Sequence, residues 1–301
     1  MRLKVPASTT NFGAGFDTFG LALNLYNVFE VHKSSQFSVQ IEGEGKHLPT
    51  GENNLVIKVY KRCCEAYGER PSPFSLRQIN HVPTARGLGS SATAIVGGVY
   101  IFERLHRKSL SLKEKLKIAF EFENHPDNLL PAMVGGFVIC VSGDPVTYSR
   151  LTFPEDLSLS FVVPDFELST QEARRVLRQE VPLEDAVFNL QRASLFVSAL
   201  IGRKYELLRT AVEDRLHQPY RARLIRGIED VFSAGYRAGA YAVFLSGAGP
   251  TVCALCSSGQ EVEIGNSMKQ AFAQVGVKAR VLNLRGSNEG ATWLNTPSQD
   301  S

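Results

Sequence analysis

The stretch VPTARGLGSSATAIVGG, residues 82–98, places glycines, small residues and two adjacent serines directly before an apolar run with helical spacing. Glycine and serine ahead of a helix expose consecutive backbone N–H groups, and the helix N-terminus adds its dipole, so such a loop favours a bound anion such as phosphate. The glycines of RGLGSSA (86–92) remove side chains that would block the approach. We therefore predict a phosphate-binding loop followed by a helix over 90–105.

Two well-known phosphate loops fit this stretch poorly. A Walker loop requires a lysine after a glycine, and none is present here. A dinucleotide-binding G-x-G-x-x-G loop, whose relaxed form tolerates Ala92, follows the first strand of a βαβ unit, whereas this loop begins about 85 residues into the chain. For one such loop taken alone, a plain tight turn that caps a helix remains an alternative.

Two further stretches resemble this loop in composition. PASTTNFGAGFD, residues 6–17, gathers small residues and ends in an acid, and SGAGP, residues 246–250, is a glycine turn between two strand-like runs. Each could be purely structural by itself. Three such clusters in one chain form a more specific pattern, and they indicate a shared ligand site.

Composition excludes several classes of protein. The chain has 301 residues, 44% hydrophobic and 21% charged, which is ordinary for a globular protein and long enough for two domains around a cleft. The net charge is only +3, and the densest group of basic residues, 215–226, contains no series of aromatic side chains, so the sequence gives no support to nucleic-acid binding. We expect no signal peptide and no membrane span. The five cysteines are predicted to be reduced and mostly buried in a cytoplasmic protein.

Periodicity predicts alternating helices and strands along the whole chain. Helices are expected over 54–67, 90–105, 112–123, 170–178, 186–200, 224–238 and 263–275, and strands within 3–43 and over 74–82, 136–141, 159–163, 241–245, 251–256, 278–284 and 291–294. HPDN at 125–128 is predicted to end a helix in a turn. The loop-rich segments SGDPVTY (142–148) and TFPEDLS (152–158) predict a domain boundary near 150, which gives domains of 1–150 and 151–301.

The three glycine stretches resemble the signature motifs of the GHMP kinases, and most closely those of homoserine kinases. The segment ENHPDN (123–128) resembles a further motif of the family. STQEAR (169–174) and HQPYR (217–221) resemble segments of the homoserine kinase branch. The departures are small: Ala14 replaces a proline of the first motif, and Arg178 and Arg226 stand at two other usual proline positions.

The resemblance implies an α+β fold of two domains. The N-terminal domain would be of the ribosomal-protein-S5-like α/β type with a left-handed βαβ crossover, and the C-terminal domain would be ferredoxin-like. The implied activity is the ATP-dependent, Mg²⁺-dependent phosphorylation of L-homoserine to O-phospho-L-homoserine, a step of threonine biosynthesis. Alternatives are a kinase of the same type acting on another small alcohol and a non-catalytic ligand sensor of the same fold. A homodimer is one option for its assembly.

The resemblance also implies the nucleotide and metal residues. ATP would be bound by Asn54, Pro83, Arg86, Gly87, Leu88, Gly89, Ser90, Ser91, Ala92, Gly247 and Gly249. Mg²⁺ would be held by Ser91 and Glu123, because this hard cation prefers oxygen ligands.

The substrate residues follow from the charges of a zwitterion. Asp17 suits the ammonium group, and Arg174 and Arg221 suit the carboxylate, which guanidinium binds in a bidentate manner. Other polar residues would orient the substrate: they are Asn11, Asn128 and Thr170.

The predicted catalytic residues are Asn11, Asn128 and Arg174, and they include no general base. Mevalonate-type relatives use an aspartate at the reacting centre, and the corresponding region of this chain offers Asn128, whose amide does not take up a proton at neutral pH. His125 is interpreted as a turn residue. We therefore expect the substrate hydroxyl to attack directly.

Overall fold

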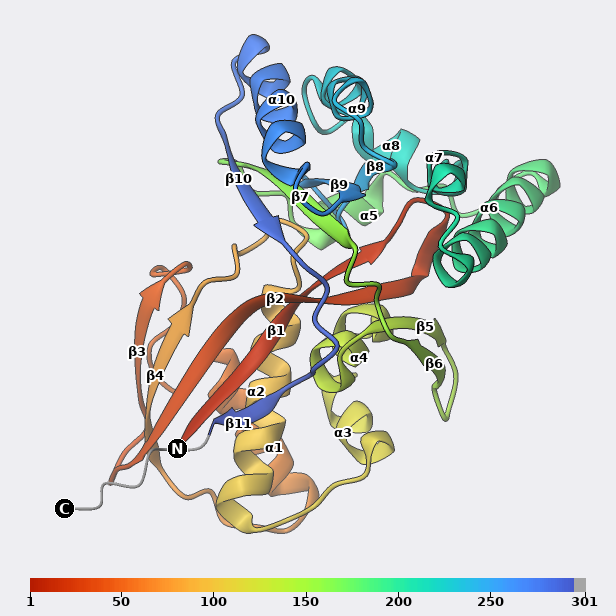
Figure 1. Cartoon of the computed structure of the whole chain (residues 1–301). Helices are drawn as coiled ribbons and strands as arrows, with labels where there is room; N and C mark the ends of the chain where they lie inside the picture. Colours follow the sequence, from red (N-terminus) through yellow and green to blue (C-terminus); the bar gives the residue numbers. More distant parts are fainter. Residues whose placement is uncertain (295–301) are drawn as a thin grey trace.

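Two β-sheets, joined by a long β-hairpin, organise the chain in this computed structural model, which describes residues 1–294 (Figure 1). The hairpin strands β1 and β2 run through the first sheet and reach the helices beside the second sheet. None of the helices within residues 1–294 is long and apolar enough to cross a membrane.

The first sheet has seven strands within the described residues. They are β1 (Arg2–Asn11), β2 (Gly15–Lys33), β3 (Ser38–Gly43), β4 (Phe74–Asn80), β5 (Phe137–Val141), β6 (Thr147–Leu151) and β11 (Thr292–Leu294). The main order is β11-β1-β2-β4-β3, and β5 pairs with both β2 and β6. The pair β3–β4 is parallel and is joined by the helix α1 (Leu55–Ala66), which forms a βαβ unit.

Four helices cover this sheet on one side (Figure 1). They are α1, α2 (Ser90–His106), α3 (Leu112–Ala119) and α4 (Pro126–Val134). Helix α2 buries Ile95, Val99 and Phe102, whose spacing of four and three residues puts them on one helical face. This packing fixes the N-terminus of α2, and therefore the glycine loop before it, at the junction of the two sheets.

The second sheet is antiparallel throughout and has the order β10-β7-β9-β8. Its elements are β7 (Leu157–Pro164), α9 (Ile228–Arg237), β8 (Ala242–Leu245), β9 (Val252–Ser257), α10 (Glu261–Gln274) and β10 (Ala279–Leu284). This β-α-β-β-α-β succession is the ferredoxin-like arrangement, so the expected two-domain α+β fold is confirmed. The exact boundary at residue 150 stays a prediction; β11, from the end of the described chain, pairs with β1 of the first sheet.

Four helices and a 3₁₀ turn lie between β7 and α9 in the described part of the chain. They are α5 (Thr170–Arg175), α6 (Leu183–Gly202), the 3₁₀ turn η1 (Tyr205–Leu207), α7 (Leu208–Ala211) and α8 (Gln218–Ala222). Buried aromatic rings connect this region to both sheets: the ring centroid of Phe12 lies 5.4 Å from that of Phe137, 5.3 Å from Phe196 and 4.7 Å from Phe244. Residues from β5, α6, β8 and the turn between β1 and β2 thus share one core, which holds the two sheets together.

Two local predictions are wrong. HPDN does not only form a turn, because Pro126 begins α4; proline suits the first position of a helix, where its missing N–H is not needed. The predicted loop over 142–148 contains the start of β6, whose edge position and exposed side chains left no apolar pattern in the sequence. The helix predicted over 112–123 is correct in place but ends at Ala119.

Candidate active site

One cavity, with a volume of about 110 Å³, gathers the glycine stretches and residues from both halves of the chain. It brings together most of the predicted site: Asn11, Asp17, Pro83, Arg86, Gly87, Leu88, Gly89, Ser90, Ser91, Ala92, Glu123, Asn128, Thr170, Arg174, Arg221 and Gly247. Asn54 and Gly249 are predicted site residues that do not line it. Thr10, Ala85, His125, Asp127 and Ala248 line it without having been predicted.

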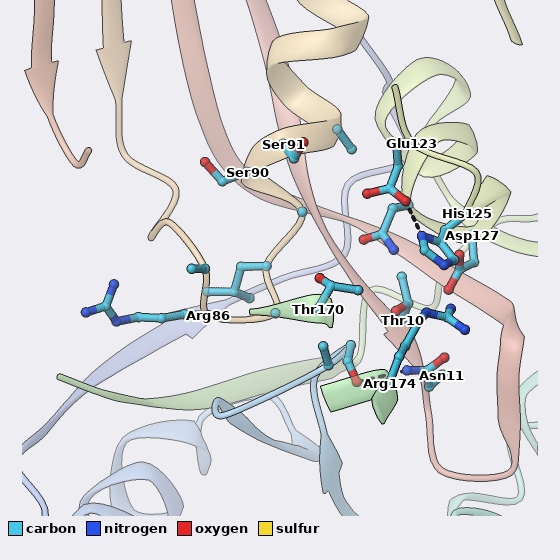
Figure 2. A pocket seen from close by; sticks show the side chains of 18 of the residues that line it. Thr10, Asn11, Arg86, Ser90, Ser91, Glu123, His125, Asp127, Thr170 and Arg174 are labelled. Carbon is cyan, nitrogen blue, oxygen red and sulfur yellow. Dashed lines mark hydrogen bonds and ion pairs between the residues drawn. The ribbon is translucent and has the colours of Figure 1, made fainter. Parts of the chain in front are cut away.

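The N-terminus of α2 opens into this cavity. Gly89 is its N-cap residue with φ of 71°, and no side chain caps the first N–H groups of the helix. Ser90 and Ser91 are the first two helical residues, and Figure 2 shows them where α2 begins. Uncapped N–H groups, the helix dipole and two hydroxyls form a site suited to phosphate oxygens.

The glycines of the loop also allow three chain segments to approach one another. A Cβ atom on Gly87 would lie 2.1 Å from the carbonyl oxygen of Ser246, and one on Gly89 would lie 2.2 Å from Oγ of Ser8. Ser246 Oγ donates to the Gly87 carbonyl over 2.6 Å. The missing side chains are therefore needed for loop-to-loop contact, in addition to the open approach that the sequence predicts.

Glu123 and His125 lie next to this N-terminus. Nδ1 of His125 and Oε1 of Glu123 contact each other just before α4, as the dashed line in Figure 2 marks. Within residues 1–294, no group of three or more His, Cys, Asp or Glu side chains could form a metal cage by itself. A Mg²⁺ ion here would take Glu123, a serine hydroxyl and phosphate oxygens, which is the usual way this ion is bound with nucleotides.

Three charged groups face one another on the other side of the cavity. Arg174, from α5, is 2.6 Å from the Asp17 carboxylate. Arg221, from α8, is only 2% exposed; its Nε donates to the Ala173 carbonyl and its Nη1 to the Gly247 carbonyl. Burial, together with Arg174, lowers the pKa of Arg221 to about 10. The three residues predicted to bind the ammonium and carboxylate groups of a zwitterion therefore lie together in the cavity.

Asp127 is the main residue that sequence reasoning missed. Its side chain lines the cavity, is 2% exposed, and its Oδ1 has no hydrogen-bond partner among the described residues. Burial, with a contribution from the Asp17 carboxylate, raises the pKa of Asp127 to about 7. Its position inside the motif segment ENHPDN was the available signal, but an acid after a proline was interpreted as a turn residue.

The predicted asparagines have different surroundings. Asn11 accepts from the Asp17 N–H and donates to the Gly247 carbonyl, so it connects the first and third glycine stretches. Asn128 accepts from the Ser8 hydroxyl through Oδ1. Asn54 caps α1 and donates to Pro49 and Gln78, so its carboxamide is engaged inside the first domain.

Arg86 lines the cavity but does not point into its centre. Its guanidinium donates to the carbonyls of Pro164 and Asp165 over 3.0 and 2.7 Å, and Figure 2 shows the side chain directed away from Thr10 and Glu123. It fastens the phosphate loop to the end of β7. The unexpected arginines lie elsewhere: Arg178 stacks on the Tyr220 ring outside the cavity, and Arg226 is exposed.

Known proteins resemble the chain over nearly its full length. The family described as GHMP kinases N terminal domain matches residues 54–136, and GHMP kinases C terminal matches residues 196–274. A homoserine kinase from Aquifex aeolicus is 54% identical, covering 96% of this chain and 98% of that protein. A homoserine kinase from Persephonella marina is 47% identical, covering 97% of each chain. The crystal structure of a homoserine kinase from Cytophaga hutchinsonii superposes with a TM-score of 0.88 at 30% identity, covering 97% of this chain and 96% of that one.

The chain belongs to the GHMP kinase family. The relatives that match it at these identities carry the name homoserine kinase. As a kinase of this family the chain uses ATP with Mg²⁺. The uncapped N-terminus of α2 fits the phosphates, and the oxygens of Glu123 and Ser91 fit the cation.

Proposed function

We propose that the chain phosphorylates the side-chain hydroxyl of L-homoserine, giving O-phospho-L-homoserine for threonine biosynthesis. The relatives' names support this substrate. When bound, ATP supplies the phosphoryl group, and Mg²⁺ offsets the charge of its phosphates. The residues of this chain bind and orient the acceptor.

One observation carries the proposal: the cavity contains two buried polar atoms of opposite character that lack partners among residues 1–294. They are Oδ1 of Asp127, an acceptor, and Nε of Arg174, a donor. A buried polar group without a partner costs about 1–3 kcal/mol. An amino acid, with an ammonium and a carboxylate group, would satisfy both, and a neutral alcohol would satisfy neither charge.

The roles of the charged residues follow from this pairing. Asp17 and Asp127 would hold the ammonium group, and Arg174 and Arg221 the carboxylate. The existing Asp17–Arg174 ion pair would open to admit the zwitterion between its members. Thr170, at the first position of α5, would place the amino-acid end beside Arg174.

The hydroxyl end would lie between Asn128 and the start of α2. Asn128 uses Oδ1 toward Ser8, which leaves its Nδ2 group as a donor for the substrate hydroxyl oxygen. Asn128 does not accept the proton, and Asp127 is assigned to the ammonium group, so the attack would proceed without a dedicated protein base and the hydroxyl proton would pass to an oxygen of the transferred phosphoryl group. Positioning and electrostatic stabilisation then carry the catalysis. The contacts of Asn11 support a role in positioning Asp17.

The test is release of ADP with Mg²⁺ and ATP in the presence of L-homoserine, L-threonine, mevalonate, shikimate or galactose. Turnover dominated by homoserine, with O-phosphohomoserine found by mass spectrometry, is the expected result. Turnover of another alcohol would agree with kinase activity but contradict homoserine as the substrate. Nucleotide binding without turnover of any of them would favour a ligand sensor.

The cellular setting completes the proposal. A cytoplasmic location agrees with the reduced state expected of the five cysteines, all of which are free and buried. We expect no nucleic-acid partner. A homodimer is one option for its assembly.

A further inference from the structure

The aromatic ring of Phe16 contacts both arginines of the predicted carboxylate site. Cζ of Arg174 lies 5.4 Å from the centroid of this ring, and Cζ of Arg221 lies 5.1 Å from it. At such distances a guanidinium group is attracted by the electron-rich face of an aromatic ring. Phe16 is half-buried and does not itself line the cavity. Any effect of the ring on a substrate therefore passes through the two arginines.

The Phe16 ring is held in place by His217. The two rings are stacked, with centroids 4.9 Å apart and an angle of 21° between their planes. His217 is fully buried; its Nε2 donates to the Gly13 carbonyl over 2.9 Å, which leaves Nδ1 to accept from Nη1 of Arg221 over 3.2 Å. Burial lowers the pKa of His217, which favours the neutral ring that these two hydrogen bonds require. Phe16, His217 and Arg221 thus form one packed unit.

The protein holds the two arginines with different firmness. Arg221 is 2% exposed and also donates to the carbonyls of Ala173 and Gly247. Arg174 belongs to α5, a helix of only six residues, and its Nη2 pairs with the Asp17 carboxylate. Its Nε has no hydrogen-bond partner among residues 1–294. Arg174 is therefore the guanidinium whose position depends most on its remaining contacts.

Substrate binding would remove the main contact of Arg174. In the proposed function the Asp17–Arg174 ion pair opens, and Asp17 turns to the ammonium group of the acceptor. The contact between Arg174 and the Phe16 ring does not involve Asp17, so it can persist when the ion pair opens. The two guanidinium groups also repel each other, since Arg174 adds to the effect of burial in lowering the pKa of Arg221. A ring that attracts both cations offsets part of this repulsion.

We infer that Phe16 is a positioning residue for the acceptor: its ring holds the guanidinium groups of Arg174 and Arg221 in the arrangement that binds the substrate carboxylate. The inference rests on the proposed function, because it concerns an acceptor that carries a carboxylate. It assigns Phe16 a role in acceptor affinity and none in nucleotide binding or phosphoryl transfer.

The first experiment measures kcat, KM for L-homoserine and KM for ATP with the full chain. Phe16→Leu keeps an apolar side chain but removes the ring, and KM for homoserine should rise about 5- to 30-fold, the loss expected for two partly exposed guanidinium–ring contacts. kcat and KM for ATP should change by less than about two-fold, because those steps do not use the carboxylate site. Phe16→Tyr keeps the ring and should remain close to the wild type.

The matched control is Phe188→Leu. Phe188 also has two arginines over its ring, with Cζ of Arg192 at 3.1 Å and Cζ of Arg215 at 4.0 Å from the centroid, but it does not line the cavity and contacts neither arginine of the carboxylate site. Its replacement should leave both KM values unchanged. A similar rise in KM for homoserine in Phe188→Leu would mean that the loss in Phe16→Leu is not specific to the carboxylate site.

A second experiment measures the coupling between Phe16 and Arg174. In an Arg174→Met background, Phe16→Leu should lower kcat/KM for homoserine by only about 2- to 5-fold, because the ring then contacts Arg221 alone. The same loss in both backgrounds would show that the ring does not act through Arg174.

Three further results would overturn the inference. They are an unchanged KM for homoserine in Phe16→Leu, a parallel rise in KM for ATP, and a loss in Phe16→Tyr as large as that in Phe16→Leu. Failure of the proposed function is distinguishable from these results, because the wild type itself would then not turn over homoserine.

Discussion

Burial of the Asp127 carboxyl group lowers the stability of the free protein, and the same group is placed to bind the substrate. The chain encloses its carboxyl group almost completely and leaves Oδ1 without a protein partner among the described residues. Asp17 and Glu123 add negative charge nearby, while His125 and Arg221 offset part of it. A buried carboxylate of this kind is stabilised when a ligand supplies the opposite charge. Two predictions for Asp127 follow.

The first prediction concerns stability without substrate. The pKa of Asp127 is raised to about 7 in the folded protein, from an ordinary value of 3.8. The folded state therefore binds this proton more tightly than the unfolded state does, so the free energy of unfolding is highest below pH 3.8 and decreases as the pH rises toward 7. Asp127→Asn should therefore stabilise the free protein at pH 8, by a few kcal/mol at most, and by much less at pH 4. Urea unfolding at both pH values measures this. An equal or lower free energy of unfolding for the variant at pH 8 would contradict it.

The second prediction concerns the pH dependence of catalysis. If the ionised Asp127 holds the substrate ammonium group, kcat/KM for homoserine should fall about tenfold per pH unit below 7, through KM and with kcat little changed. Asp127→Asn should lack this limb. A limb of the same pKa in kcat would instead indicate that Asp127 takes the proton of the hydroxyl, and the base-free account would be wrong.

Arg174 gives the third prediction. Arg174→Met removes a charged donor from the expected carboxylate site, and kcat/KM for homoserine should fall by about 10- to 150-fold. Arg174→Lys should recover only part of the loss, because lysine lacks the planar pair of donors. Arg178→Met is the control on the neighbouring turn, since Arg178 stacks on Tyr220 outside the cavity. Similar losses in Arg174→Met and Arg178→Met would argue against a specific clamp.

At the scale of elements, the phosphate loop depends on contact between segments. Gly89 has φ of 71° and no room for a Cβ atom beside Ser8, whereas Gly276 has φ of 79° and open space around it. Alanine in this backbone region costs about 1–2 kcal/mol by itself. Gly276→Ala should show that loss of stability alone, and Gly89→Ala should also lose most kinase activity. Denaturant unfolding and ADP release measure the two effects; full activity in Gly89→Ala would show that the loop tolerates displacement.

The elements were predictable where their own residues determine them. Helices α1, α2 and α10 and the strands of the second sheet have strong periodicity and were placed within a few residues. The start of α4 was misread because proline and aspartate favour turns and helix N-termini alike, and the sheet that packs against it decides between them. A glycine of β2 shows this: a Cβ on Gly20 would lie 2.0 Å from the Asp127 carbonyl oxygen.

At the scale of the whole molecule, the candidate site is made by segments more than 200 residues apart in the chain. Composition and spacing indicated an anion loop, and the family resemblance indicated which distant residues accompany it. Neither indicated which of these side chains are buried. The burial of Asp127 and Arg221 and the contact between Asp17 and Arg174 arise because the two sheets meet around the hairpin.

The charges that line the cavity would make this kinase selective for a zwitterion. The most direct measurement compares kcat/KM for L-homoserine with that for 4-hydroxybutyrate, which lacks the ammonium group, and 3-aminopropanol, which lacks the carboxylate. We expect a loss of at least about 100-fold for each, since each analogue leaves charged groups of the cavity unpaired. Comparable turnover of either analogue would contradict the charge pairing proposed for Asp17, Asp127, Arg174 and Arg221.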